Sequence, residues 1–148
     1  DDDGDSDTND IDALARAIAS GDQDPLFDLT GDGQIDQADV LDWLNVAGQL
    51  NNGFGNGYLP GDANLDGYVD GQDFIAWNNH KFQQGTWSQG DFTANGIVDG
   101  LDFIVWNNHK FLNIFEGSTV PEPGNGAMLV TAALVGLVST RGRRGGTV

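Results

Sequence analysis

Three twelve-residue stretches of the sequence, 28–39, 62–73 and 91–102, carry oxygen-bearing side chains at the same positions. In each stretch Asp, Asn or Thr occupies positions 1, 3 and 5, Gly occupies position 6, and Asp occupies positions 9 and 12. Calcium takes about six to eight hard oxygen ligands from a loop that wraps around the ion. Glycine is needed at position 6 because the chain turns there through a backbone conformation that side chains disfavour. The spacing therefore predicts three calcium loops.

In such a loop, positions 1, 3, 5, 9 and 12 supply side-chain oxygens, position 9 directly or through water, and position 7 supplies its backbone carbonyl. The candidate ligands of loop 1 are Asp28, Thr30, Asp32, Gln34, Asp36 and Asp39. Those of loop 2 are Asp62, Asn64, Asp66, Tyr68, Asp70 and Asp73. Those of loop 3 are Asp91, Thr93, Asn95, Ile97, Asp99 and Asp102. Loop 3 has three acids at these positions, against four in the other two, so it is predicted to bind most weakly. One Asp-rich match could be a simple turn, but three in register favour calcium.

An apolar segment with helical spacing follows each loop, so each loop is expected to lead into a helix. Residues 61–82 and 90–111 are two copies of one unit, identical at 15 of 22 positions, and residues 28–46 form a looser copy. The helix residues expected in the core are Phe74, Ile75, Trp77, Phe103, Ile104 and Trp106. A sugar-stacking platform is the alternative for these aromatic residues. The aliphatic residue at position 8 is expected to let neighbouring loops pair, and Trp87 to pack between the two copies.

The first twelve residues are acidic and allow two readings. Counted as a loop, they offer Asp1, Asp3, Asp5, Asn9 and Asp12, without glycine at position 6. Otherwise they form a disordered acidic tail. A helix is predicted after them, ending near Ser20 with Gly21 as its C-cap.

Composition favours a metal-stabilised, noncatalytic module. Cysteine is absent and the apolar residues are concentrated near the C-terminus, so a metal is the internal staple left for a small core. Residues 1–120 hold 22 of the 23 acids and three of the six bases, which argues against binding nucleic acid or anionic membranes. No nucleophile–base pair stands out, and His80 and His109 suit helix ends better than a transition-metal site. We therefore expect no enzyme activity.

Residues 48–60 are rich in Gly and Asn and are predicted to be a linker. After Gly117 the sequence runs from Val120–Pro123 (VPEP) into the apolar stretch Ala127–Val138, followed by three arginines. We expect a short transmembrane helix with its arginine end in the cytoplasm. The alternative is a buried C-terminal helix.

Loop-then-helix units in pairs, with Asp at position 12 and no helix directly before the loop, resemble the dockerin family. The resemblance covers residues 61–111 and, more loosely, 28–46. It implies paired calcium-binding F-hand motifs on a secreted protein, of the kind found in polysaccharide-degrading complexes. Many dockerins bind cohesin modules through Ser-Thr at loop positions 10 and 11, where this sequence has Gln37–Ala38, Gly71–Gln72 and Gly100–Leu101. The calcium-binding pattern of the family is therefore present, whereas its Ser-Thr recognition pair is not. The resemblance implies a cohesin-like or other protein partner.

The VPEP motif, the apolar stretch and the arginine cluster resemble a PEP-CTERM sorting tail. Such tails imply export, transient anchoring in the inner membrane and processing by an exosortase-type enzyme. The expected location is the cell envelope or the extracellular space.

The sequence therefore predicts a small, mainly α protein built of tandem EF-hand or dockerin-like calcium loop–helix pairs. The predicted divisions are a degenerate pair at 1–47, a linker at 48–60, a calcium-binding pair at 61–115 and a sorting and anchor tail at 116–148. The expected function is calcium-dependent docking or surface display. The alternatives are the C-terminal part of a secreted polysaccharide-degrading enzyme, whose catalytic domain would lie elsewhere, and a structural matrix protein.

Overall fold

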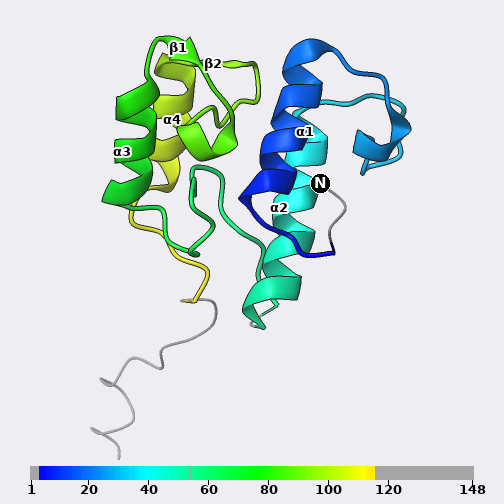
Figure 1. The fold of residues 1–148 in the computed structure, drawn as a ribbon. Helices are drawn as coiled ribbons and strands as arrows, with labels where there is room; N and C mark the ends of the chain where they lie inside the picture. Colours follow the sequence, from blue (N-terminus) through cyan, green and yellow to red (C-terminus); the bar gives the residue numbers. More distant parts are fainter. Residues whose placement is uncertain (1–3, 54, 116–148) are drawn as a thin grey trace, which may run out of the picture. The chain divides into compact units, whose positions relative to one another are not determined.

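The computed structural model describes residues 4–53 and 55–115, and about half of these lie in helices. They include four α-helices, α1 (Thr8–Ser20), α2 (Gln37–Asn52), α3 (Gly71–His80) and α4 (Gly100–His109) (Figure 1). The shorter elements are η1 (Pro25–Phe27), η2 (Trp87–Gln89), β1 (Gln83–Gln84) and β2 (Ile97–Val98). The prediction of a small, mainly α protein is confirmed for this part of the chain. Within it, no helix is long and apolar enough to cross a membrane, and the stretch predicted to do so lies outside the described residues.

All four α-helices begin with the same capping box. An Asp at the N-cap accepts a hydrogen bond from the backbone two residues on, and an Asp at the third helical position accepts one from the N-cap backbone. These two bonds satisfy N–H groups that a helix start leaves without partners, and the negative charges suit the helix dipole. In α2, α3 and α4 the two Asp residues are positions 9 and 12 of the loops. The predicted ligands therefore also start the helices.

The helix ends agree only in part with the sequence-based boundaries. Helix α1 ends at Ser20 with Gly21 in the left-handed conformation, as predicted. Helix α2 continues to Asn52, so the first residues of the predicted linker are helical. A side chain at Gly48 would collide with the backbone of Tyr58, so glycine allows the following segment to return against the helix. The predicted linker is therefore packed against α2 around Gly57 and Tyr58.

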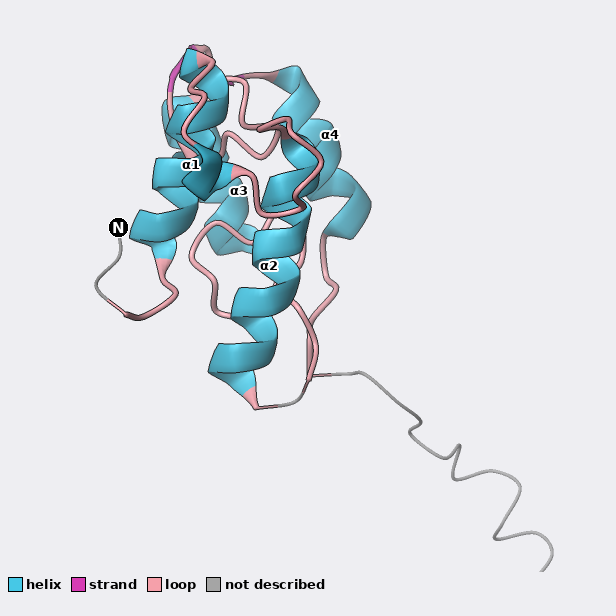
Figure 2. Ribbon diagram, turned by 90° about the vertical axis from the view of Figure 1, so that its right-hand side faces the viewer, coloured by secondary structure: helices cyan, strands magenta, loops and turns pink. Residues whose placement is uncertain are grey.

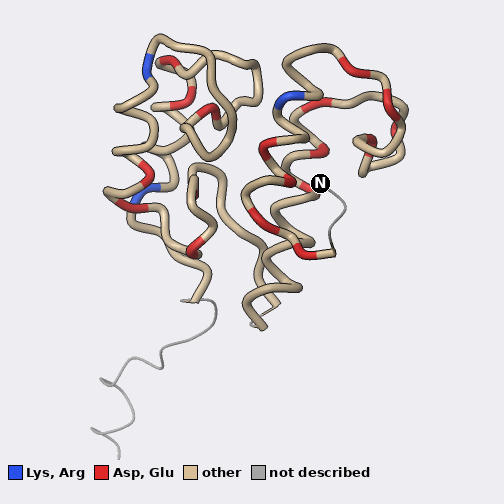
Figure 3. The backbone as a smooth tube through the Cα atoms, viewed as in Figure 1, with Lys and Arg blue, Asp and Glu red and all other residues tan. Residues whose placement is uncertain are grey.

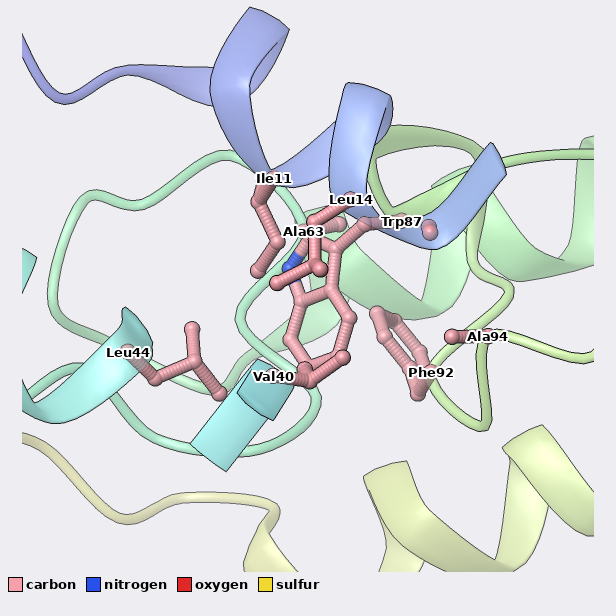
Figure 4. Packing of buried hydrophobic residues seen from close by; sticks show 9 residues of the cluster. Ile11, Leu14, Val40, Leu44, Ala63, Trp87, Phe92 and Ala94 are labelled. Carbon is pink, nitrogen blue, oxygen red and sulfur yellow. The ribbon is translucent and has the colours of Figure 1, made fainter. Parts of the chain in front are cut away.

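The helices form two pairs that share one hydrophobic core. Helix α1 packs against α2, α3 packs against α4, and η2 contacts both α1 and α3 (Figures 1 and 2). Trp87 is fully buried at the centre of the core, surrounded by residues of both halves (Figure 4). The buried members of this cluster are Ile11, Leu14, Ala15, Val40, Leu44, Ala63, Trp87, Phe92 and Ala94. The described residues, 4–53 and 55–115, belong to one compact unit.

The two copies at 61–82 and 90–111 are paired reciprocally. Ile97 of loop 3 pairs with Gln84, which follows α3, and Tyr68 of loop 2 pairs with Asn113, which follows α4. The two copies are offset by 29 residues, so Tyr68 is the equivalent of Ile97 and Asn113 is the equivalent of Gln84. The two pairs are therefore the same contact, made once in each direction. The prediction that neighbouring loops pair with each other through position 8 is wrong, because the segment after the opposite helix takes that place.

The aromatic seam lies between α3 and α4 as expected, but two of its predicted members face outward. Phe74 lies 5.1 Å from Trp106 and Trp77 lies 5.2 Å from Phe103, measured between ring centroids. Ile75 and Ile104 are 56% and 53% exposed, so placing them in the core was wrong. Each directly follows a seam phenylalanine, and a helix turns successive residues to different faces. The four rings fill the seam without them.

Candidate metal centre

The first position of each predicted loop is held by backbone N–H groups of the same loop. Asp62 Oδ2 accepts from Gly67 N at 2.9 Å and Oδ1 accepts from Asp66 N at 3.2 Å. The corresponding bonds to Asp91 come from Gly96 at 2.7 Å and Asn95 at 3.1 Å. Asp28 of loop 1 is bonded in the same way. In all three loops, therefore, positions 2–6 wrap around the carboxylate at position 1.

The carboxylate at position 12 closes each loop. Asp73 accepts from Ala63 N at 2.8 Å and from Asp70 N at 2.7 Å, joining the start of loop 2 to the start of α3. Asp102 accepts from Thr93 N and Asp99 N, both at 2.8 Å, in loop 3. Asp39 bonds Thr30 N and Asp36 N in loop 1. The aspartate, one methylene shorter than the common EF-hand glutamate, spans the loop in each copy.

The backbone takes the same unusual turns in each loop. Position 6 is glycine with φ of 87° in all three loops, as the sequence predicted. Position 4 is also left-handed, and in loops 2 and 3 it is occupied by Leu65 and Ala94, with φ of 56° and 54°. Left-handed backbone costs non-glycine residues about 1–2 kcal/mol, so the surrounding contacts impose it. Loop 1 has glycine at position 4, Gly31 with φ of 73°, but Leu65 and Ala94 give no such signal, and sequence reasoning missed this second turn.

At position 7 the candidate ligand is the backbone carbonyl and not the side chain. In loop 2, the pairing with the segment after α4 uses the carbonyls of Gly67 and Val69, on either side of Tyr68. Successive carbonyls of an extended strand point in opposite directions, so the carbonyl of Tyr68 faces away from that segment. The Tyr68 side chain is 48% exposed. This is the orientation that a carbonyl ligand at position 7 requires.

Burial sets the electrostatics of loops 2 and 3. Burial raises the pKa of Asp62 to about 7, and the negative charge of Asp73 acts in the same direction. The hydrogen bond from Gly67 acts to lower this pKa but does not outweigh burial. Burial likewise raises the pKa of Asp91 to about 6. The pKa values of Asp73 and Asp102 are also raised, first by burial. A divalent cation would relieve these buried, mutually repelling carboxylates.

Loop 1 is more open than the other two. Thr30 and Asp32 are exposed and Asp28 is half-buried, whereas Asp62 and Asp91 have 0% and 1% of their surface exposed. Burial acts to raise the pKa of Asp39, but hydrogen bonds from the backbone of Asp36 and Thr30 outweigh it and the pKa is lowered. The three loops thus share one geometry in two different environments.

The start of α1 repeats positions 6 to 12 of the loop frame, shifted by two residues from the frame counted from Asp1. Gly4, with φ of 98°, precedes the N-cap Asp7 by three residues, as Gly33, Gly67 and Gly96 precede theirs. Position 12 of this frame is Asp10, so the frame that placed Asp12 there was wrong. Asp12 instead accepts from Ser88 N at 2.8 Å and from Ser88 Oγ at 2.7 Å. Asp1 and Asp3 lie outside the described residues.

One carboxylate trio in the described part of the chain gathers its oxygens within 4.8 Å of one another, and it lies here, at Asp5, Asp7 and Asp10. These residues take positions 7, 9 and 12 of the shifted frame. Loops 1 to 3 carry Gln34, Tyr68 and Ile97 at position 7, so their acids come from more widely spaced positions. Figure 3 shows how acidic positions recur along the loops and helix starts of both halves.

The donor set of the three loops fits calcium. Every candidate ligand offers oxygen and none offers nitrogen or sulfur, which is the preference of a hard cation. The side chains at positions 1, 3, 5, 9 and 12 and the position 7 carbonyl all belong to one continuous turn of chain. Loop 2 would supply Asp62, Asn64, Asp66, Asp70 and Asp73, and the other loops their equivalents.

Three tryptophan contacts at the loops were not predicted in detail. Trp77 and Trp106 each donate to a backbone carbonyl of the other copy, Asp99 at 2.7 Å and Asp70 at 2.8 Å. Trp87 donates to the carbonyl of Asp62 at 2.8 Å, and its ring packs edge-on against Phe92 at 5.3 Å. It therefore joins loops 2 and 3 to the shared core. The recurrence of Trp seven residues after position 9 was the signal available for the first two.

A hollow of about 420 Å³ lies beside α1, η1 and α2. It is lined by Asp10, Ala13, Leu14, Leu26, Phe27, Leu29 and Trp43. Asp10 is the one titratable residue of that lining, so the hollow holds no pair of acid and base groups.

No family model, no curated protein and no solved structure matches this chain.

Proposed function

We propose that this chain is a noncatalytic, dockerin-like calcium-binding module of an exported protein. The observation that carries the proposal is the common geometry of the three loops. In each, the position 1 carboxylate accepts N–H bonds from the turn around glycine, and the position 12 carboxylate closes the loop onto a helix start. Sequence copies that differ at loop positions 2 to 5 still place the same oxygens in the same way.

The module's chemistry is metal-coupled folding. Calcium, when bound, supplies positive charge to loops whose own ligands repel one another. The protein's residues do the rest. Asp73 and Asp102 complete the capping boxes of their helices, the position 6 glycines make the turns, and Trp87 anchors loop 2 to the core. Folding and binding then stabilise each other, by an amount that grows with calcium concentration.

In this proposal, the folded module docks or displays the protein to which it belongs, through a cohesin-like or other protein partner. Helix starts at loop positions 10 and 11, where dockerins often carry their recognition pair, are exposed at Gly71–Gln72 and Gly100–Leu101. The PEP-CTERM-like tail, processed by an exosortase, would place the module in the cell envelope or outside the cell. That part of the proposal rests on the sequence of residues 116–148.

A calcium titration of the full chain tests the proposal. Calorimetry should show saturable binding near three sites, and circular dichroism should show a gain of helix that chelator reverses. The variants Asp62→Asn and Asp91→Asn should each remove about one site, whereas Asp42→Asn, which changes an acid outside the loops, should leave the number of sites unchanged. The proposal fails if millimolar calcium does not bind, or if the fold is the same in calcium and in chelator.

A further inference from the structure

Loops 2 and 3 are held by side chains of each other's helices. The indole N–H of Trp77, on the helix that follows loop 2, donates to the carbonyl of Asp99 in loop 3 at 2.7 Å. Trp106, on the helix that follows loop 3, donates to the carbonyl of Asp70 in loop 2 at 2.8 Å. Asp70 and Asp99 are position 9 of their loops and the N-caps of their helices. Each indole therefore fixes the exit of the opposite loop.

The entrance of each loop also lies against the opposite tryptophan. A Cβ built on Gly90, directly before loop 3, would lie 2.5 Å from the Cα of Trp77. A Cβ on Gly61, directly before loop 2, would lie 3.1 Å from the Cα of Trp106. Glycine at these two places lets the loop start in contact with the other copy's helix backbone. Both ends of each loop are thus placed by the helix of the other.

Each loop is connected to the other through the helix that follows it. Asp73 belongs to the ligand set of loop 2 and is the third residue of α3, and Trp77 lies one turn further along the same helix. The tryptophan rings are packed against the seam phenylalanines, Trp77 on Phe103 and Trp106 on Phe74, so neither helix can shift alone. Order imposed on loop 2 therefore reaches Asp99, and order imposed on loop 3 reaches Asp70.

Loop 1 does not have this arrangement. Trp43 is its equivalent tryptophan, seven residues after Asp36, as Trp77 is seven after Asp70. Among the hydrogen bonds of the described residues, none runs from the Trp43 indole to a loop carbonyl, and the ring instead lines the hollow beside α1. Gln37 at the start of α2 donates to the carbonyl of Phe92 at 3.2 Å, but in the described part of the chain neither Trp77 nor Trp106 donates to a carbonyl of loop 1.

We propose that Trp77 and Trp106 are positioning residues, each for the calcium loop of the other repeat, so that loops 2 and 3 bind calcium cooperatively while loop 1 binds outside this pair. The inference rests on the proposed calcium binding and concerns how the sites are coupled. Coupling between two sites is reciprocal, so loss of either loop must weaken the other by the same factor.

The test follows each loop separately in the full chain. The amides of Gly33, Gly67 and Gly96 each donate to the position 1 carboxylate of their own loop, so their NMR signals report on loops 1, 2 and 3 in turn. In the parent protein, the signals of Gly67 and Gly96 should change at the same calcium concentrations. The signal of Gly33 should follow a separate titration curve. Asp91→Asn should weaken binding at loop 2, and Asp62→Asn binding at loop 3, by an equal factor of about 5–150.

The tryptophan variants locate the path. Trp77→Phe keeps a ring in the seam but removes the N–H, and it should weaken loop 3 more than loop 2. Trp106→Phe should show the opposite preference, and Trp43→Phe is the matched control that should change neither. A purely structural role for the indoles would weaken all loops alike, and that result would overturn the inference.

Failure of this inference is distinguishable from failure of the proposed function. If the parent protein binds no calcium, the proposed function fails and the inference with it. If it binds calcium but Asp91→Asn leaves loop 2 unchanged, the coupling alone is disproved. The aspartate variants give this answer even if the tryptophan variants do not fold.

Discussion

At the residue scale, the most informative groups are the buried position 1 carboxylates of loops 2 and 3. Asp62 and Asp91 are buried and accept hydrogen bonds from backbone N–H groups of their own loops, and Asp91 also accepts one from the Thr93 hydroxyl. Burial disfavours their charged form, and their neighbours Asp73 and Asp102 add repulsion. The environment that strengthens an interaction with a cation thus destabilises the loop without one.

The raised pKa values of Asp62 and Asp91 predict opposite pH trends with and without calcium. A raised pKa means that the folded, calcium-free protein holds protons that the unfolded chain has lost. These carboxyls therefore stabilise the fold at low pH, and that contribution disappears as the pH rises through about 6 and 7. In chelator, the protein should be less stable at pH 8 than at pH 5 by a few kcal/mol, since each pKa unit is worth about 1.4 kcal/mol.

Thermal melts at pH 5 to 8 check this prediction. Excess calcium should reverse the trend, because protons compete with the ion for the same carboxylates. The double variant Asp62→Asn and Asp91→Asn, melted in chelator, is the control and should flatten the dependence. A calcium-free parent protein that gains stability from pH 5 to pH 8 would contradict the prediction.

At the element scale, helix starts serve both as structural caps and as the ends of loops. The same two Asp residues satisfy the first backbone N–H groups of α2, α3 and α4 and belong to the predicted ligand sets. Helix α1 uses its own capping box in the same way. A further acid, Asp12, ties α1 to η2 by accepting two hydrogen bonds from Ser88. This contact joins elements from the two halves of the described chain.

Removal of the Asp12 carboxylate should weaken the contact between α1 and η2. Asp12→Ala leaves the backbone N–H of Ser88 without its acceptor, and it should cost about 1–3 kcal/mol of unfolding free energy. Ser88→Ala removes only the hydroxyl and should cost less. Urea denaturation in saturating calcium measures both. Equal losses in the two variants would show that the backbone bond contributes nothing.

At the scale of the whole molecule, the two helix pairs are built around one buried tryptophan. Trp87 comes from the connection between the two copies, yet its neighbours include Ile11, Leu14 and Val40 from the first helix pair (Figure 4). Neither pair encloses these side chains by itself. We therefore expect residues 4–115 to unfold as one cooperative unit, although the sequence divides them into two repeated parts.

Leu14→Ala tests this cooperativity. Leu14 is 2% exposed, and truncation of a buried leucine costs about 2–5 kcal/mol. Leu14 does not belong to the aromatic seam between α3 and α4. The variant should nevertheless lower the unfolding midpoint measured by near-ultraviolet dichroism of the aromatic residues as much as the midpoint measured by helix content. Leu50→Ala, at a side chain 71% exposed, is the control. Two separate transitions would show that the pairs fold independently.

The sequence by itself determined the local features of this protein. Loop frames, position 6 glycines, helix starts and the end of α1 follow from residue type and spacing, because each depends on hydrogen bonds within about a dozen residues of chain. The proposed ligand residues are of this kind.

Only the tertiary structure decided which surfaces those local units bury. Ile75 and Ile104 have the same apolar character as the seam residues, but they are exposed because α3 and α4 turn another face toward each other. Each loop pairs with the segment after the opposite helix, and Trp77 and Trp106 bond to the opposite loop, so these contacts join residues far apart in sequence. The greater burial of Asp62 than of Asp28 also results from packing between distant segments. Such contacts depend on how the elements pack, and a periodic pattern does not encode the partner of each face.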